Sequence, residues 1–210
     1  MPAGDTLLEA QAIELWRGDH HLLRGVSLSV TAGELVQLTG PNGAGKTSLL
    51  RILCGLLPPE SGEIRWRGES IRASRDAFHR ELVYLAHLNA LKAELTADEN
   101  LATEVGLKRL TTSEERSAVL RTLGIAQCAQ LPARVLSAGQ RRRLAFARVL
   151  LTRGTLWILD EPTTNLDVQG VALVEGLLKA HLDAGGAVLT AAHHGLLATD
   201  PRARTIALAA

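Results

Sequence analysis

The sequence predicts an α/β fold with a mostly parallel sheet, an antiparallel β flank and an inserted helical sub-lobe. Three features favour this class: strand-like runs alternate with helical patterns, one apolar run shows no alternation, and a glycine-rich turn joins a strand to a helix. The 210 residues with 46 % hydrophobic content are enough for a sizeable core. We therefore expect residues 1–210 to form a single folded domain.

The expected elements follow from hydrophobic patterning and turn residues, which also mark the early part of the chain as the antiparallel flank. Strand-like runs span residues 7–16, 26–30, 35–39, 63–66, 82–85, 156–159, 187–190 and 205–208. Helical patterns span residues 46–54, 138–151 and 165–182. Because residues 156–159 are apolar throughout, we expect a central parallel strand that is buried on both faces.

Residues 88–136 carry helix formers and no strand signal, which predicts the helical sub-lobe. Within it we expect helices over residues 95–105 and 113–123, the second opened by threonines and two acidic residues. Three leucines of this segment could line a groove for a partner or belong to an ordinary core: Leu88, Leu91 and Leu95.

A glycine-rich turn follows the run 35–39 and leads into the helix 46–54. Its residues are Gly40, Pro41, Asn42, Gly43, Ala44, Gly45, Lys46, Thr47 and Ser48. The glycines let consecutive N–H groups turn inward as an anion-binding nest, and the start of the helix adds its positive dipole end. Lys46 provides a charge for the β- and γ-phosphates, and the Thr47 hydroxyl is a ligand for Mg²⁺. The turn therefore predicts a nucleoside triphosphate site.

Two acidic residues, Asp160 and Glu161, end the apolar run 156–159. A carboxylate at the end of a parallel strand beside a phosphate loop is placed to hold Mg²⁺ through water, which suits Asp160. Glu161 can then polarise an attacking water as general base. The alternative is a pair of acids that face solvent.

A helix start is predicted at Ser137, which is a good N-cap residue. The small residues Ala138 and Gly139 and the following Gln140 leave backbone N–H groups open to an anion. Taken alone, this segment indicates only where a helix begins.

Taken together, these motifs resemble the nucleotide-binding domain of ABC transporters, and the resemblance covers nearly the whole chain. The residues that carry it, in the family's order and spacing, are Gly40–Thr47, Leu136–Gln140, Leu156–Glu161, Thr164–Asp167 and His193.

The resemblance implies ATP hydrolysis with Mg²⁺ in a head-to-tail dimer, either of two copies or of one copy and a close relative. ATP would lie between the phosphate loop of one copy and Ser137–Gln140 of the other. Asp167 would lie at the dimer seam, and His193 would contact the γ-phosphate. A loop pair or an adventitious metal site is the alternative for His193 and His194.

Within the family the chain looks most like the haem-exporter, or cytochrome c maturation, branch. The matching segments are residues 32–40, 84–87, 94–101 and 136–143. This resemblance implies an integral membrane partner and a peripheral place on the cytoplasmic face of the inner membrane. It leaves open whether ATP drives transport or acts as a switch that assembles or releases a haem-carrier complex.

Two positions depart from the general family pattern. His87 stands where the family carries a glutamine for Mg²⁺ and water, and histidine, unlike glutamine, can change charge between pH 6 and 7. We therefore expect His87 to make turnover sensitive to pH in that range. At the adenine-stacking position the chain has Arg17 with Trp16 beside it, and either side chain can stack on a base.

Composition and charge exclude several other classes. A formal net charge of +1 gives no sign of a nucleic-acid partner, and the one tight basic run, 141–143, is typical of a solvated helix face. Cys54 and Cys128 indicate buried free thiols in a reducing compartment. The sequence shows no secretory signal and no run long enough to cross a bilayer. A kinase or GTPase would not account for Leu136–Gln140, and no guanine-reading motif is present.

Overall fold

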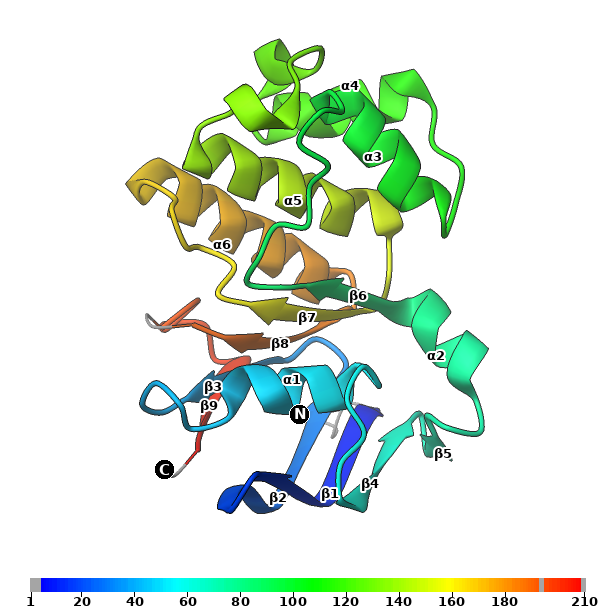
Figure 1. The fold of residues 1–210 in the computed structure, drawn as a ribbon, viewed down its shortest axis with the longest axis vertical. Coiled ribbons are helices and arrows are strands. Elements are labelled where there is room, and N and C mark those ends of the chain that lie inside the picture. Colours follow the sequence, from blue (N-terminus) through cyan, green and yellow to red (C-terminus); the bar gives the residue numbers. More distant parts are fainter. Residues whose placement is uncertain (1–4, 193–194, 209–210) are drawn as a thin grey trace.

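The fold is given by a computed structural model in which residues 5–192 and 195–208 are described (Figure 1). The strands are β1 Thr6–Arg17, β2 His20–Thr31, β3 Leu35–Thr39, β4 Ser61–Trp66, β5 Glu69–Ser70, β6 Leu82–Leu85, β7 Leu156–Asp160, β8 Ala187–Ala191 and β9 Ala203–Ala207. The α-helices are α1 Lys46–Leu53, α2 Arg75–Glu81, α3 Ala97–Gly106, α4 Ser113–Thr122, α5 Ala138–Thr152 and α6 Val168–Asp183. Two short 3-10 helices are η1 Ala126–Cys128 and η2 Ala133–Val135.

The strands form two sheets, as the sequence predicts. The larger sheet has the order β6-β7-β8-β3-β9, and every neighbouring pair in it is parallel. The smaller sheet has the order β2-β1-β4-β5 and is antiparallel. Figure 1 shows α1 between the two sheets and α5 and α6 on the opposite face of the parallel sheet. The α/β class with an antiparallel flank is confirmed.

Strand β7 is buried on both faces because successive side chains of a strand point to opposite sides. Leu156 and Ile158 pack into the core that α1 shares with the antiparallel sheet. Trp157 and Leu159 pack into the second core, under the helical layer. All five residues of the strand are buried, so the absence of alternation in this run predicted its position correctly.

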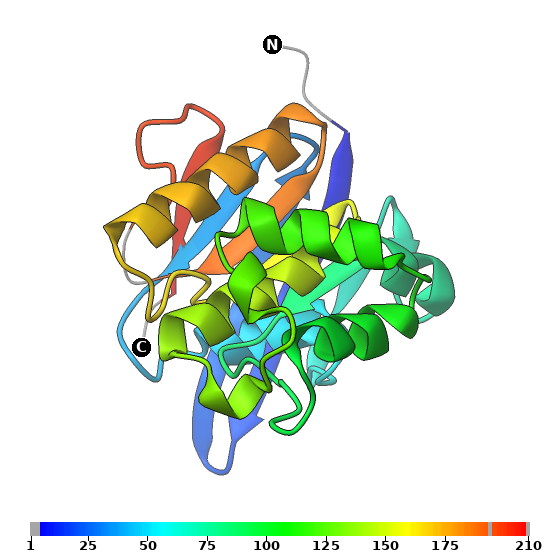
Figure 2. The ribbon, with the colours of Figure 1, turned by 90° about the horizontal axis from the view of Figure 1, so that it is seen from above.

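The segment 88–136 holds α3, α4 and the two 3-10 helices. Both α-helices begin with a capping box, Thr96 with Glu99 and Thr112 with Glu115, which satisfies N–H groups in the first turn. Seen from above in Figure 2, the green helices of this segment and the gold α6 lie over different parts of the structure. Of the three leucines noted above, Leu88 is 77 % exposed, whereas Leu91 packs against the second core.

Several boundaries differ from the sequence-based expectation. β2 begins at His20 rather than at residue 26, because it pairs with β1 up to the hairpin turn. α6 begins at Val168 rather than at residue 165, because Asn165 adopts a left-handed backbone with φ +65° that cannot continue a helix. The sequence analysis missed β5 and α2. Cys54 and Cys128 are free and buried, as expected.

Candidate nucleotide-binding site

The phosphate loop connects the end of β3 to the start of α1, and α1 begins at Lys46 with Gly45 as its N-cap. Gly40 and Gly45 have φ angles of +136° and +90°. A Cβ atom on Gly40 would lie 2.6 Å from the carbonyl oxygen of Leu208, so glycine is required there both for its conformation and for its lack of a side chain. The loop is thus fixed by close backbone packing.

The Lys46 ammonium lies against its own loop. Its Nζ donates to the carbonyl oxygens of Gly40, at 2.8 Å, and Pro41, at 3.0 Å. An ammonium carries three donors, so these two bonds leave one N–H for a further acceptor at the loop. The side chain is therefore held where an anion on the nest would meet it.

One cavity of about 420 Å³ gathers half of the predicted site residues, from four separate segments. Its lining residues are Arg17, Leu22, Asn42, Gly43, Gly45, Lys46, Thr47, Ser48, His87, Asp160 and Glu161. The volume lies in the range typical of small-molecule sites. Gly40, Pro41 and Ala44 belong to the same loop but do not line the cavity.

Asp160, the last residue of β7, is 1 % exposed. Within the described part of the chain its Oδ2 is a buried polar atom without a hydrogen-bond partner. Leaving such an atom unpaired is costly, which points to a cation on that side of the carboxylate. Thr47 lines the same cavity, and Mg²⁺ is commonly held by one or two protein oxygens together with phosphates and water. These residues fit Mg²⁺, although no group of three His, Cys, Asp or Glu occurs among the described residues.

Glu161 follows at the edge of the sheet in a left-handed conformation, with φ +52°. A residue with a side chain is strained there and persists only where its surroundings hold it. Its N–H donates to the carbonyl oxygen of Ala191 at 2.8 Å, which extends the pairing of β7 with β8 by one residue. Glu161 thus lines the cavity directly after the buried strand.

The residues at the two positions that depart from the family pattern differ in how they lie relative to the cavity. His87 is exposed and lines the phosphate-loop cavity. Arg17 also lines it, whereas Trp16 does not. Trp16 is 50 % exposed, and its ring stacks on that of His21 with centroids 4.2 Å apart and planes 5° apart.

The segment 137–140 lies at a second cavity of about 390 Å³, whose lining includes Ser137, Gly139, Gln140, Arg143 and Asp167. Ser137 Oγ accepts from the Gln140 N–H at 3.1 Å, and Gln140 Oε1 accepts from the Ser137 N–H at 2.8 Å. This capping box confirms Ser137 as the N-cap of α5. Ala138 is exposed at the first position of the helix and does not line the cavity.

Asp167 caps α6 and also lines this second cavity. Its Oδ1 accepts from the Gly170 N–H at 2.7 Å and pairs with Arg143 Nη2 at 3.0 Å. The Gly170 hydrogen bond and the Arg143 charge lower the pKa of Asp167, so its carboxylate is ionised well below neutral pH. His193 and His194 lie outside the described residues, so the structure gives no position for either.

The sequence analysis missed Arg142 as a candidate functional residue. The run 141–143 was expected to be a solvated helix face, which is wrong for Arg142 because this side chain is 1 % exposed. Its guanidinium donates to the backbone of both loops that lead to the cavity, after β6 and after β7. Helical spacing could have indicated this, because Arg142 lies three and four residues before the buried Ala145 and Phe146.

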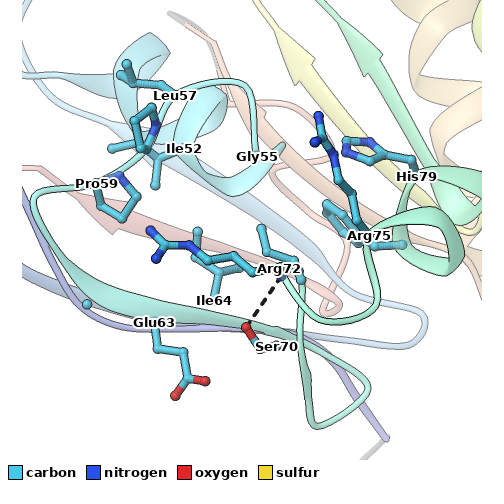
Figure 3. A pocket seen from close by; sticks show the side chains of 14 residues that line it. Ile52, Gly55, Leu57, Pro59, Glu63, Ile64, Ser70, Arg72, Arg75 and His79 are labelled. Carbon is cyan, nitrogen blue, oxygen red and sulfur yellow. Dashed lines mark hydrogen bonds between the residues drawn. The ribbon is translucent and has the colours of Figure 1, made fainter.

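A larger groove, of about 550 Å³, lies away from this chemistry (Figure 3). It is bounded by the end of α1, by β4 and by α2, and its apolar lining includes Ile52, Ile64 and Phe78. Arg75 extends beside His79 in Figure 3, and burial together with the Arg75 charge lowers the pKa of His79. None of the predicted site residues lines this groove, so the smaller cavity at the phosphate loop is the candidate site.

The model of the ABC transporter family matches residues 23–164, which include the phosphate loop, residues 137–140 and the acidic pair at the end of β7. The chain belongs to the ABC transporter family. As a member of this family it is an ABC-type ATPase that binds nucleotide. Two solved structures show the same fold. An ATP-binding subunit of an ABC transporter superposes with a TM-score of 0.83 at 24 % identity, over 96 % of this chain and 85 % of that one. A nucleotide-free ATP-binding cassette superposes with a TM-score of 0.76 at 22 % identity, over 90 % and 82 %.

Sequence relatives give a narrower place within the family. The chain is 47 % identical to a protein of Nitrosomonas europaea, over 93 % of this chain and 92 % of the relative. It is 48 % identical to one of Methylococcus capsulatus, over 91 % and 93 %, and 42 % identical to one of Vibrio parahaemolyticus, over 96 % and 99 %. Each of the three is named cytochrome c biogenesis ATP-binding export protein CcmA. The chain therefore belongs to this branch of the ABC transporter family, as its sequence motifs indicate.

Proposed function

We propose that the chain hydrolyses ATP to energise a membrane complex of cytochrome c biogenesis that exports haem. The observation that carries this proposal is the single cavity in which the phosphate loop meets Asp160 and Glu161. The names of the close relatives support the pathway.

We assign the roles at this cavity as follows. Lys46 and the loop N–H groups bind the phosphates, and Thr47 and Asp160 would hold Mg²⁺, which would neutralise phosphate charge when bound. Glu161 orients and activates the attacking water. By family resemblance His193 contacts the γ-phosphate. We assign the adenine contact to Arg17, because it lines the cavity whereas one face of Trp16 is covered by His21.

The two cavities of one chain are incomplete halves of a shared site. Phosphoryl transfer depends on charge placed around the γ-phosphate, and the second cavity offers the N-terminus of α5 for that purpose. We propose that Ser137, Ala138, Gly139 and Gln140 of one copy cover the nucleotide on the phosphate loop of another. Asp167 then lies at the seam of a head-to-tail homodimer.

The membrane component is a separate chain in this proposal. No helix within the described residues is both long and apolar enough to span a bilayer. We therefore propose that the chain binds peripherally to an integral membrane subunit at the cytoplasmic face of the inner membrane.

The dimer is tested with Glu161→Gln, which keeps the shape of the side chain and removes the base. With Mg-ATP this variant should elute at the mass of a dimer by light scattering, and with Mg-ADP it should remain monomeric. A monomer under both conditions would contradict the proposed site.

The membrane role is tested by affinity purification from detergent-solubilised membranes that express the tagged chain. We expect an integral membrane protein to co-purify, and reconstituted vesicles to accumulate haem when ATP is present. Release of a haem carrier from the complex without accumulation would favour the ATP-dependent switch instead.

A further inference from the structure

Arg142 is the largest fully buried side chain in the described part of the chain. Burial lowers its pKa to about 10, with the Asp160 and Glu161 charges opposing that shift, so the guanidinium is still charged at neutral pH. A buried charge is retained only where it is well hydrogen-bonded. Its hydrogen-bond acceptors therefore show what the residue holds in place.

On one side the guanidinium binds three consecutive carbonyl groups at the end of β7. Nη2 donates to the carbonyl oxygens of Asp160, at 2.7 Å, and Glu161, at 2.6 Å. Nε donates to the carbonyl oxygen of Pro162 at 3.1 Å. These bonds hold the strained left-handed turn at Glu161, and a charged donor makes them stronger than ordinary amide bonds.

On the other side the same guanidinium binds the loop that follows β6. Nη1 donates to the carbonyl oxygen of Ala86 at 3.0 Å and to Asn89 Oδ1 at 3.0 Å, with a longer contact of 3.4 Å to the carbonyl oxygen of His87. One planar group thus links the backbone that carries His87 to the backbone that carries Glu161.

Arg142 belongs to α5, whose N-terminus is the Ser137–Gln140 segment. α5 is a single helix from Ala138 to Thr152, so a displacement of its first turn carries the guanidinium with it. The residue is therefore positioned between the second cavity and both loops of the first.

We propose that Arg142 is a positioning residue for ATP hydrolysis: it sets the backbone of Glu161 and of the 86–89 loop, and couples both to the segment 137–140. The inference rests on the proposed role of Glu161 as the base. Because Arg142 does not line the nucleotide cavity, its loss should lower kcat and leave nucleotide affinity intact.

The experiment compares Arg142→Lys and Arg142→Gln with Arg148→Gln in the full chain. Arg148 is a matched control on α5, since it is also largely buried but contacts Ala90 and Glu104 instead. We expect the Arg142 variants to lose about a hundredfold in kcat with ATP affinity within twofold, as for a small misplacement of a reacting group. Lysine should not rescue, because it lacks the planar fork. A wild-type kcat in a folded Arg142 variant, or equal losses in kcat and affinity, would overturn the proposal.

A second variant leaves the buried charge of Arg142 in place. Asn89→Ala removes only the side-chain acceptor on the 86–89 loop, and we expect it to lower kcat in the same direction but less than Arg142→Gln. It keeps the proposal testable should the Arg142 variants fail to fold, and an unchanged kcat in Asn89→Ala would then contradict the link between the two loops.

A double mutant separates this proposal from the role of Glu161. In the Glu161→Gln background, Arg142→Gln should cause no further loss of the residual hydrolysis, because residues that act as one unit are not additive. Multiplied losses would contradict the positioning role. Wild-type turnover in Glu161→Gln alone would instead remove the proposed base and leave the contacts of Arg142 unaffected.

Discussion

The two cavities of the chain differ in whether their polar groups already have hydrogen-bond partners. At the phosphate loop, Lys46 keeps one donor for an anion and Asp160 keeps a buried oxygen without a partner within the described residues. At the second cavity the polar side chains already have partners: Ser137 and Gln140 each accept from the other's backbone N–H, and Arg143 pairs with Asp167. The first cavity therefore has polar groups left for a ligand, whereas the named polar side chains of the second are already paired, which fits the proposal that it closes over a nucleotide bound to another copy.

This comparison predicts that the two cavities can be disabled separately. Loss of a group at the phosphate loop should remove nucleotide binding. Loss at the second cavity should leave binding in place and remove only what depends on another copy.

The largest effect is expected for Lys46→Ala, which removes the ammonium held by the Gly40 and Pro41 carbonyls. We expect ATP binding to become undetectable by calorimetry at concentrations that saturate the wild type, since hydrogen bonds to charged groups contribute about 1.5–3 kcal/mol. Lys179→Ala, at an exposed position of α6, is the control and should bind normally. Normal ATP affinity in Lys46→Ala would remove the phosphate-loop role.

The next effect is expected for Ala138→Asp in the Glu161→Gln background. An acid at the first position of α5 suits the helix dipole, so thermal stability should be kept or slightly raised. Facing a triphosphate, however, the same charge should repel it and prevent the ATP-dependent dimer, while nucleotide binding by the single copy is unchanged. Ala138→Asn is the neutral control. A dimer of Ala138→Asp as strong as that of the control would contradict the shared site.

A smaller effect is expected for His87→Gln at the edge of the first cavity. Glutamine has no charge change between pH 6 and 7, whereas histidine can titrate in that interval. The rate profile of the variant should therefore be flatter than that of the wild type across this range. Superimposable rate profiles would show that His87 does not cause the pH dependence of turnover.

The smallest effect is expected away from both cavities, at His181. Its ring stacks on Trp157 with centroids 3.8 Å apart, and its Nε2 lies 3.1 Å from the carbonyl oxygen of Thr155. Burial lowers the pKa of His181, so below about pH 6.5 the unfolded chain takes up a proton that the folded chain resists. Stability should fall as the pH drops through this range.

The variant His181→Phe keeps a ring on Trp157 and removes the titration. Between pH 7.5 and 5.5 its Tm should fall by about 2 °C less than that of the wild type. His20→Gln, at an exposed position of β2, should follow the wild type. An equal fall in Tm for His181→Phe would assign the pH dependence to other groups.

The sequence by itself determined the parts that depend on short segments. The phosphate loop, the acids at the end of β7 and the N-cap at Ser137 each lie within a few consecutive residues, and the requirements that fix them are local backbone ones. The burial of 156–159 on both faces was predictable for the same reason, because side-chain alternation is a property of the strand alone.

Tertiary structure decided what these segments meet. Arg17 and His87 lie far apart in sequence, at or just beyond the ends of strands of different sheets, and only the packing of the two sheets brings both to the phosphate loop. In the sequence, Arg142 is one of three consecutive arginines that resemble a solvated helix face. In the structure, the packing of α5 against the parallel sheet buries Arg142 against two loops. The start of α6 was missed for a related reason, since the left-handed Asn165 is packed against Gly139. Local sequence patterns therefore predict the backbone conformation and the chemical groups of a segment, whereas long-range packing determines which other residues those groups contact.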